Sequence, residues 1–234
     1  MPQPIKYFSD DPSVTFGVEA LKRYPQLALY VSAIVTSWSN VENAINLAFL
    51  MLVGSGSETA ITIYQELSGS GSRDTAISAA ARTALSKSDF ELFCAVRRVL
   101  KRVGKQRNNV VHGMIGFCEQ VPEAFVIVHQ NDLFNQMNAL FRKQHLSGDP
   151  EGVKAWASEQ FRTTSIVYKA QDFHKIIERC HWAEAIAQEL AVICAEVHPG
   201  KDKSREKLLS EPLISRALEN VRGRSWTSCA TARK

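Results

Sequence analysis

Residues 27–53 have the sequence LALYVSAIVTSWSNVENAINLAFLMLV, in which apolar side chains recur alternately four and three positions apart. Side chains with this spacing lie along one face of an α-helix. The face consists of Leu27, Val31, Ile34, Trp38, Val41, Ile45, Ala48 and Leu52. The stretch therefore predicts a long amphipathic helix. Its apolar face is expected to be buried in the core or, as the alternative, against a second copy of the chain.

A second long helix is predicted over residues 173–197, where the same spacing recurs before His198-Pro199-Gly200 stops it. Between the two long helices, GSGS at 54–57 and SGSGS at 68–72 separate shorter helical stretches. Ser88 and Glu91 form a capping box that opens a further helix, whose far end we expect Gly104 to weaken.

The pattern changes after Gly113, where short apolar runs at 114–117 and 124–129 flank the proline turn EQVPE. Two strands joined in a hairpin are expected here, and residues 164–169 are a candidate third strand. The fold class predicted is all-α (mainly): a bundle of about five helices with a small β-hairpin or three-strand insert after Gly113. The expected organisation is an N-terminal arm over 1–24, a helical domain over 25–199 with its insert at 114–169, and a basic C-terminal tail over 200–234.

The composition, 45% hydrophobic and 22% charged over 234 residues, is that of a soluble globular protein and excludes disorder throughout. Five cysteines without a CxxC pair favour neither a zinc ribbon nor a disulfide framework, and a reducing cytoplasm fits best. The start of the chain does not resemble a signal peptide, and Asn40, Glu42, Asn43 and Asn46 make 27–53 too polar for an easy membrane span.

The net charge of +4 is unevenly distributed, because residues 1–200 carry about −1 and the rest is concentrated in the tail. We expect the tail to be a solubilising or disordered end or, alternatively, an arm that attracts RNA.

Within the body, RRVLKRVGKQRNNVVHG at 97–113 holds six Lys or Arg and no acid. Its basic residues lie in two helical rows, Arg97, Lys101 and Lys105 in one and Arg98 and Arg102 in the other. Such a ridge is either a solvated helix face or, without acidic neighbours, a surface that favours a polyanion such as RNA.

Arg107 and His112 end this ridge in the form Arg-Asn-x-x-x-His-Gly, which resembles the signature of HEPN-family domains. The setting is also similar to bacterial HEPN-like proteins. SWSNVENAI at 37–45 lies on the long helix before the motif, IYQELSGSGSR at 63–73 intervenes, and a long amphipathic helix follows. The resemblance covers roughly residues 25–198. Residues 130–165 are longer than a minimal domain needs, and the family does not explain the tail.

The resemblance implies a helical bundle that dimerises, and often a metal-independent endoribonuclease. The residues suit that chemistry. His112 can take or give a proton near neutrality, Arg107 can hold phosphate oxygens, and Asn108 can position either group. Gly113 would let the substrate backbone approach closely. Glu42 is a helix-surface residue or, alternatively, a carboxylate that orients His112 or Arg107.

Spacing adds a geometric expectation. Residues five apart on a continuous helix are about 140° apart around its axis, so Arg107 and His112 of one chain would not share a row. A homodimer in which each His faces the partner's Arg is therefore expected.

The predicted partners are RNA, a second copy, and an inhibitor or antitoxin protein, with neither a cofactor nor a metal. The other histidines (129, 145, 174, 181 and 198) form no ligand grouping and are interpreted as structural or surface residues. The alternative function is a HEPN-like binding or dimerisation module without turnover, and the remaining one is a helical interaction protein.

Overall fold

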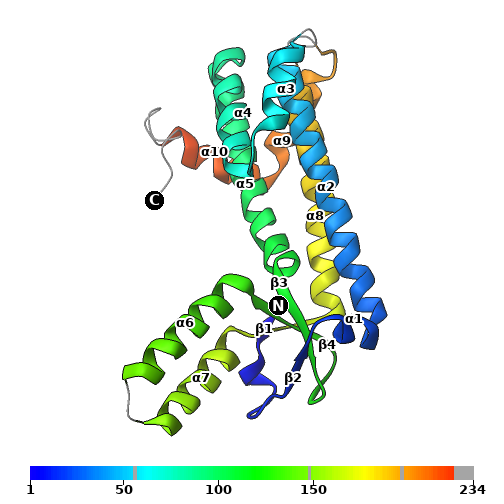
Figure 1. Cartoon of the computed structure of the whole chain (residues 1–234). Helices are drawn as coiled ribbons and strands as arrows, with labels where there is room; N and C mark the ends of the chain where they lie inside the picture. The colour runs from blue at the N-terminus through cyan, green and yellow to red at the C-terminus, as the bar shows by residue number, and fades with distance from the viewer. Residues whose placement is uncertain (55–56, 147–148, 196–197, 224–234) are drawn as a thin grey trace. The chain divides into compact units, whose positions relative to one another are not determined.

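The computed structural model describes residues 1–54, 57–146, 149–195 and 198–223. This part of the chain is mostly α-helical, which confirms the predicted class, and it contains a five-stranded sheet. Ten α-helices occur in these residues, where about five were expected. In chain order (Figure 1) the elements are β1 (Gln3–Pro4), η1 (Ile5–Tyr7), β2 (Val14–Phe16), α1 (Val18–Arg23), α2 (Pro25–Val53), α3 (Glu58–Glu66), α4 (Ser70–Ala84), α5 (Lys87–Val111), β3 (Gly113–Cys118), β4 (Val121–His129), α6 (Gln130–Leu146), α7 (Pro150–Thr164), β5 (Ile166–Lys169), α8 (Ala170–Cys194), α9 (Lys201–Ser210) and α10 (Pro212–Arg222).

The chain forms two compact units, and each is built from two separate stretches of sequence. Unit 1 comprises residues 1–36 and 105–179, and unit 2 comprises residues 37–104 and the chain from Cys180 onward. The boundaries between the units fall inside the three longest helices, α2, α5 and α8. The sheet therefore belongs to unit 1, together with the Arg107–His112 motif.

The sheet of unit 1 is antiparallel throughout, with strand order β1-β5-β4-β3-β2. The hairpin of β3 and β4 and the pairing of β5 with β4 confirm the strands expected after Gly113. The predicted hairpin or three-strand insert is too small, because the observed sheet has five strands. The two further strands, β1 and β2, form its edges and come from the expected N-terminal arm. These strands have only two and three residues. Segments that short carry too few side chains for an alternating pattern to be recognised in the sequence.

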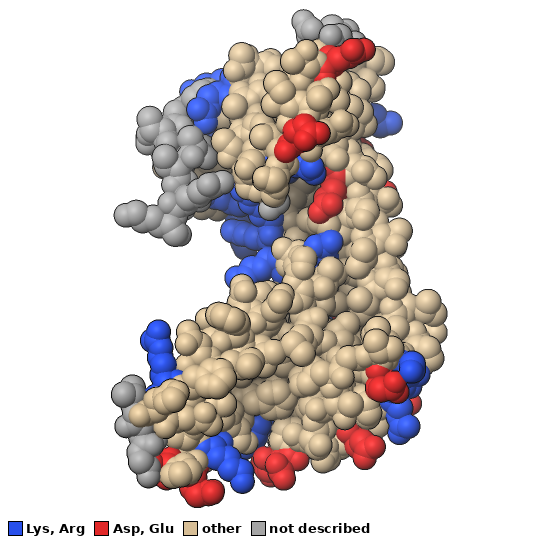
Figure 2. All heavy atoms as spheres, in the orientation of Figure 1, with Lys and Arg blue, Asp and Glu red and all other residues tan. Residues whose placement is uncertain are grey.

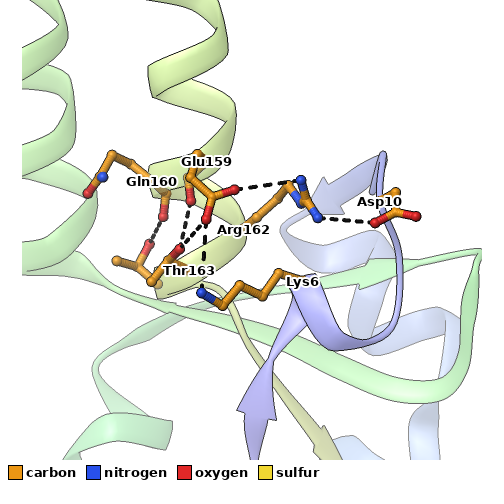
Figure 3. Close-up of polar contacts among 7 residues, drawn as sticks. Lys6, Asp10, Glu159, Gln160, Arg162 and Thr163 are labelled. Carbon is orange, nitrogen blue, oxygen red and sulfur yellow. Dashed lines mark hydrogen bonds and ion pairs between the residues drawn. The ribbon is translucent and has the colours of Figure 1, made fainter.

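Polar contacts between α7 and the N-terminal segment accompany this pairing (Figure 3). Lys6 lies 3.9 Å from Glu159, and Arg162 lies 3.3 Å from Asp10 and 3.6 Å from Glu159. Ion pairs on a surface are each worth less than about 1 kcal/mol. The larger contribution comes from Ile5, which is fully buried in the apolar cluster of the sheet. The N-terminal residues are thus an integral part of unit 1.

The core of unit 2 is an apolar cluster formed by residues of α2, α3, α4, α5, α8, α9 and α10. Val41, Ile45 and Ala48 of the predicted stripe are buried in it, and Trp38 packs against it. This part of the stripe is therefore core rather than a face left for a second copy. A Cβ on Gly104 would lie 2.9 Å from the Trp38 ring, so glycine allows the indole to lie against α5. Gly104 does not end the helix, because α5 continues to Val111, and the expected weakening of its far end stays a prediction.

Residues 201–222 differ from the expected solubilising or disordered end, because they form α9 and α10. Five of their apolar side chains belong to the core of unit 2: Leu208, Ile214, Ala217, Leu218 and Val221. Their basic residues also find acids on earlier helices. Arg205 pairs with the buried Asp89, Lys207 lies 2.5 Å from Glu189, and Arg222 lies 3.0 Å from Glu91. The rest of the predicted tail, residues 224–234, lies outside the described residues.

We predict that Ile214→Ala lowers the free energy of unfolding by about 3 kcal/mol, because it opens a cavity where a fully buried side chain fills the core. Leu213→Ala is the matched control, since Leu213 is 54% exposed on the same helix and its truncation should cost less than about 1 kcal/mol. Urea unfolding monitored by circular dichroism measures both. Equal losses for the two variants would show that α10 does not pack as described.

Candidate functional site

The Arg107–His112 motif lies at the C-terminal end of α5 in unit 1. Arg107 and Asn108 belong to the last turns of the helix, His112 forms the turn after it, and Gly113 begins β3. The His112 backbone N–H donates to the Asn108 carbonyl oxygen at 3.0 Å, so helical hydrogen bonding continues to His112. The expected angular separation of Arg107 and His112 around the helix axis therefore applies to this chain. Arg107 is half-buried, whereas Asn108 and His112 are exposed.

Asn108 contacts both other polar members of the motif. Arg107 Nη1 donates to Asn108 Oδ1 at 2.9 Å, and the Asn108 main-chain oxygen accepts from His112 as described above. The side-chain bond takes one of the five N–H donors of the guanidinium. Arg107 Nε is buried without a hydrogen-bond partner. Asn108 thus contacts the guanidinium through its side chain, and its main chain continues the helix to His112.

Gly113 has a structural role that differs from the expected one. A Cβ at this position would overlap the Cγ2 methyl of Ile127 and would lie 2.9 Å from the Asn109 carbonyl oxygen. Glycine is therefore required so that the first residue of β3 can pack against β4 and the end of α5. The space beside its Cα is taken by the protein itself, which leaves no room there for a substrate backbone.

Two side chains near the motif were not identified from the sequence. His129 lies opposite Gly113 in the β3–β4 register, and its Nδ1 accepts from the Asn131 N–H at 3.3 Å. Arg179 of α8 donates from Nη1 to Gln106 Oε1 at 2.6 Å, which brings a second guanidinium beside the residue that precedes Arg107. The pairing of His129 with Gly113 and the contact of Arg179 with Gln106 join residues distant in sequence, and neither His129 nor Arg179 is part of a motif. Strand register and helix packing are the only signals that could have found them.

The basic ridge is partly neutralised within unit 2. Arg97 pairs with Asp74 of α4, and Lys101 lies 2.5 Å from the other carboxylate oxygen of the same residue. The expectation that the ridge lacks an acidic neighbour is therefore wrong for these two residues, because the acid comes from a different helix. Arg98 is half-buried, and Arg102 and Lys105 are exposed. Figure 2 shows Lys and Arg side chains gathered where α5 runs.

The pKa of Asp74 is shifted by this pairing. Burial raises the pKa, but the charge of Arg97 and hydrogen bonds from Lys101 and Arg97 outweigh it, so the pKa lies below its ordinary value of 3.8. The carboxylate is thus charged near neutral pH and holds both cations against α4. Arg97 and Lys101 are therefore paired within unit 2.

Glu42 lies in unit 2, where its Oε1 accepts from Trp38 Nε1 at 2.8 Å, one helical turn away. This bond gives the carboxylate a partner within α2. Its suggested role in orienting Arg107 or His112 stays a prediction.

Two further properties concern the described residues only. They contain no group of three or more His, Cys, Asp or Glu side chains arranged to hold a metal ion. None of their helices combines the length and the apolar character that a membrane crossing requires.

Comparison with known proteins finds no matching family model, no matching curated protein and no matching solved structure. The HEPN resemblance consequently depends on the motif itself and on the helices around it.

We predict that Gly113→Ala lowers the free energy of unfolding by about 2 kcal/mol, since the new methyl group would overlap Ile127 and crowd the Asn109 carbonyl. Gly223→Ala is the control, because the nearest atom to its Cβ would be the Glu219 carbonyl oxygen at 3.5 Å, an ordinary contact. Denaturant titration of both variants checks this. A Gly113→Ala protein as stable as the control would exclude the tight helix–strand junction.

A second prediction concerns Asp74→Asn, which removes the partner of Arg97 and Lys101 and should cost about 1 kcal/mol near neutral pH. Because the folded-state pKa is lowered, the stabilisation is present above the ordinary carboxyl pKa and is lost as pH falls through the folded value. The difference in stability between wild type and Asp74→Asn should therefore shrink below about pH 4. Thermal unfolding across pH tests it, with the exposed Glu66→Gln as control. A difference independent of pH would argue against the ion pair.

Proposed function

We propose that the chain is a metal-independent endoribonuclease of the HEPN type. The observation that carries the proposal is that the half-buried Arg107, bonded to Asn108 Oδ1, and the exposed His112 both lie at the C-terminal end of α5. A guanidinium that binds phosphate oxygens and an imidazole that transfers protons near neutral pH are the groups that RNA cleavage without a metal requires.

In the proposed reaction His112 removes the proton from a 2′-hydroxyl, and the 2′-oxygen forms a bond to the adjacent phosphorus. The bond between phosphorus and the 5′-oxygen breaks, and the leaving oxygen receives a proton from a general acid. The products are a 2′,3′-cyclic phosphate and a 5′-hydroxyl. Arg107 holds the phosphate oxygens on which negative charge develops, and Asn108 keeps the guanidinium in position.

A homodimer completes the proposed site. Helical hydrogen bonding up to His112 keeps its side chain about 140° around the axis from Arg107, so an arrangement in which each His112 faces the Arg107 of the other copy joins the two groups. In this proposal the enzyme acts on cytoplasmic RNA, in a toxin or phage-defence role under the control of an inhibitor protein. The exposed Arg102 and Lys105 attract the polyanion.

The second candidate is a HEPN-like module that binds RNA or nucleotides, or dimerises, without turnover. The same angular separation favours it, since one copy by itself does not join Arg107 and His112 into one site.

The proposed function predicts that purified wild type cleaves total RNA in the presence of EDTA. His112→Ala and Arg107→Ala should each lower the rate by about 100-fold or more, because each removes a group required in the transition state. Gel electrophoresis and detection of 2′,3′-cyclic phosphate ends provide the measurement. The exposed residues His181 and Arg23 supply matched alanine controls. Equal cleavage by wild type and both motif variants would indicate a contaminant, and salt-dependent binding without cleavage would support the module.

Complementation tests the composite site. A heterodimer of one Arg107→Ala chain and one His112→Ala chain retains one intact Arg107–His112 pair if the groups come from different copies. Mixing the two inactive variants should then restore about one quarter of wild-type activity, since half of randomly formed dimers are mixed and each has one working site. No recovery, with mixed dimers confirmed by native mass spectrometry, would place Arg107 and His112 of the same chain in each site.

A further inference from the structure

An exposed apolar row on α6 takes no part in the core of unit 1. Phe134 is 70% exposed, Met137 48% and Phe141 55%. Their spacing of three and four positions places them along one face of the helix. The opposite side of α6 is the one that packs on α7: Gln136 Nε2 donates to Thr164 Oγ1 at 2.5 Å, and Lys143 lies 5.0 Å from the Trp156 ring centre. The row therefore faces away from α7, with its aromatic rings open to a ligand.

The rest of this face carries amides, one arginine and one histidine. The exposed residues within about 80° of Phe134 around the helix axis are Asn131, Asn138, Arg142, Gln144 and His145. Asp132 is the one acid in the sequence of α6, and it lies about 160° around the axis from Phe134, on the side of α7. The exposed face thus combines aromatic rings, amide groups and positive charge, without a carboxylate.

This combination fits single-stranded RNA better than a protein partner. Unstacked bases bind to aromatic rings, their edges accept and donate hydrogen bonds to Asn and Gln amides, and phosphates pair with Arg. A second copy packed on the same face would bring Arg142 toward Arg142, with no acid on either face to pair with it. Charge complementarity therefore selects a polyanion as the occupant.

The chain places this face next to the motif. His129, the last residue of β4, lies opposite Gly113, and α6 begins at the following residue, Gln130. Phe134 is thus about one helical turn beyond the strand pair that starts at the motif. We propose that the exposed face of α6 binds the unpaired bases of single-stranded RNA that flank the phosphate held at Arg107 and His112. This inference rests on the proposed function and narrows its substrate class, because bases stacked in a duplex do not offer their faces to phenylalanine.

Binding of a short fluorescent oligouridine with 2′-O-methyl sugars tests the inference, since the blocked 2′-oxygen prevents cleavage during the measurement. We expect Phe134→Ala and Phe141→Ala to weaken binding about 5-fold each and about 30-fold together, as measured by fluorescence anisotropy. Phe134→Trp with Phe141→Trp should bind at least as tightly as wild type, because the stacking surface is kept. A duplex of the same length should bind more weakly than the single strand and should be insensitive to these substitutions. Tyr7→Ala is the control, since Tyr7 is a 68% exposed aromatic residue of the same unit.

Three outcomes would overturn the inference. The first is a double alanine variant that binds like wild type, and the second is wild type that does not bind the oligonucleotide. The third is a double variant that turns from dimer to monomer in light scattering, which would identify the face as a contact between copies. Cleavage of unmodified RNA separates this inference from the proposed function. If only the α6 inference is wrong, wild type still cleaves RNA, His112→Ala does not, and the phenylalanine variants bind like wild type. If the proposed function is wrong, RNA binding still depends on Phe134 and Phe141, but wild type does not cleave.

Discussion

The close packing of Ile127 on Gly113 is the constraint on which the candidate site depends. A side chain at residue 113 would overlap the Ile127 methyl group and crowd the Asn109 carbonyl, so the end of α5 and the start of β3 approach β4 only with glycine. That approach fixes the direction in which the chain leaves α5. It also holds His112 at the turn, places His129 opposite Gly113, and sets where α6 begins.

Pairing of charges decides which cations remain for a ligand. Many basic side chains that look available in the sequence bind acids of the same unit, since a half-buried cation without a partner is costly. Asp74 binds Arg97 and Lys101, while Asp89, Glu189 and Glu91 bind Arg205, Lys207 and Arg222. Arg107 differs, because the side chain that it contacts among the described residues is the neutral amide of Asn108. A guanidinium bound to an amide keeps its charge uncompensated, which is the condition for binding a phosphate.

The pattern of apolar residues predicted the long helices, because a continuous stripe over seven turns is visible without knowledge of the fold. Val41, Ile45 and Ala48 are buried as that stripe requires. The hairpin after Gly113 and the strand at 166–169 were predicted for the same reason, since each holds a short apolar run between turn residues. Other elements escaped prediction: β1 and β2 are too short to show a pattern, and the apolar residues of α9 are sparse among charges. Helix α10 does show helical spacing in Ile214, Ala217, Leu218 and Val221, so the sequence could have predicted it.

The sequence by itself determined the helical class and identified Arg107, Asn108 and His112 as the residues with a chemical signature, because helix periodicity and motif spacing are local properties. The tertiary structure decided which charges are already paired, why residue 113 is glycine, and that Phe134, Met137 and Phe141 form an exposed row. Each of these depends on which residues from other parts of the chain lie nearby. Asp74 is 23 positions from Arg97 and Ile127 is 14 from Gly113, and only the packed helices and the strand register bring them together.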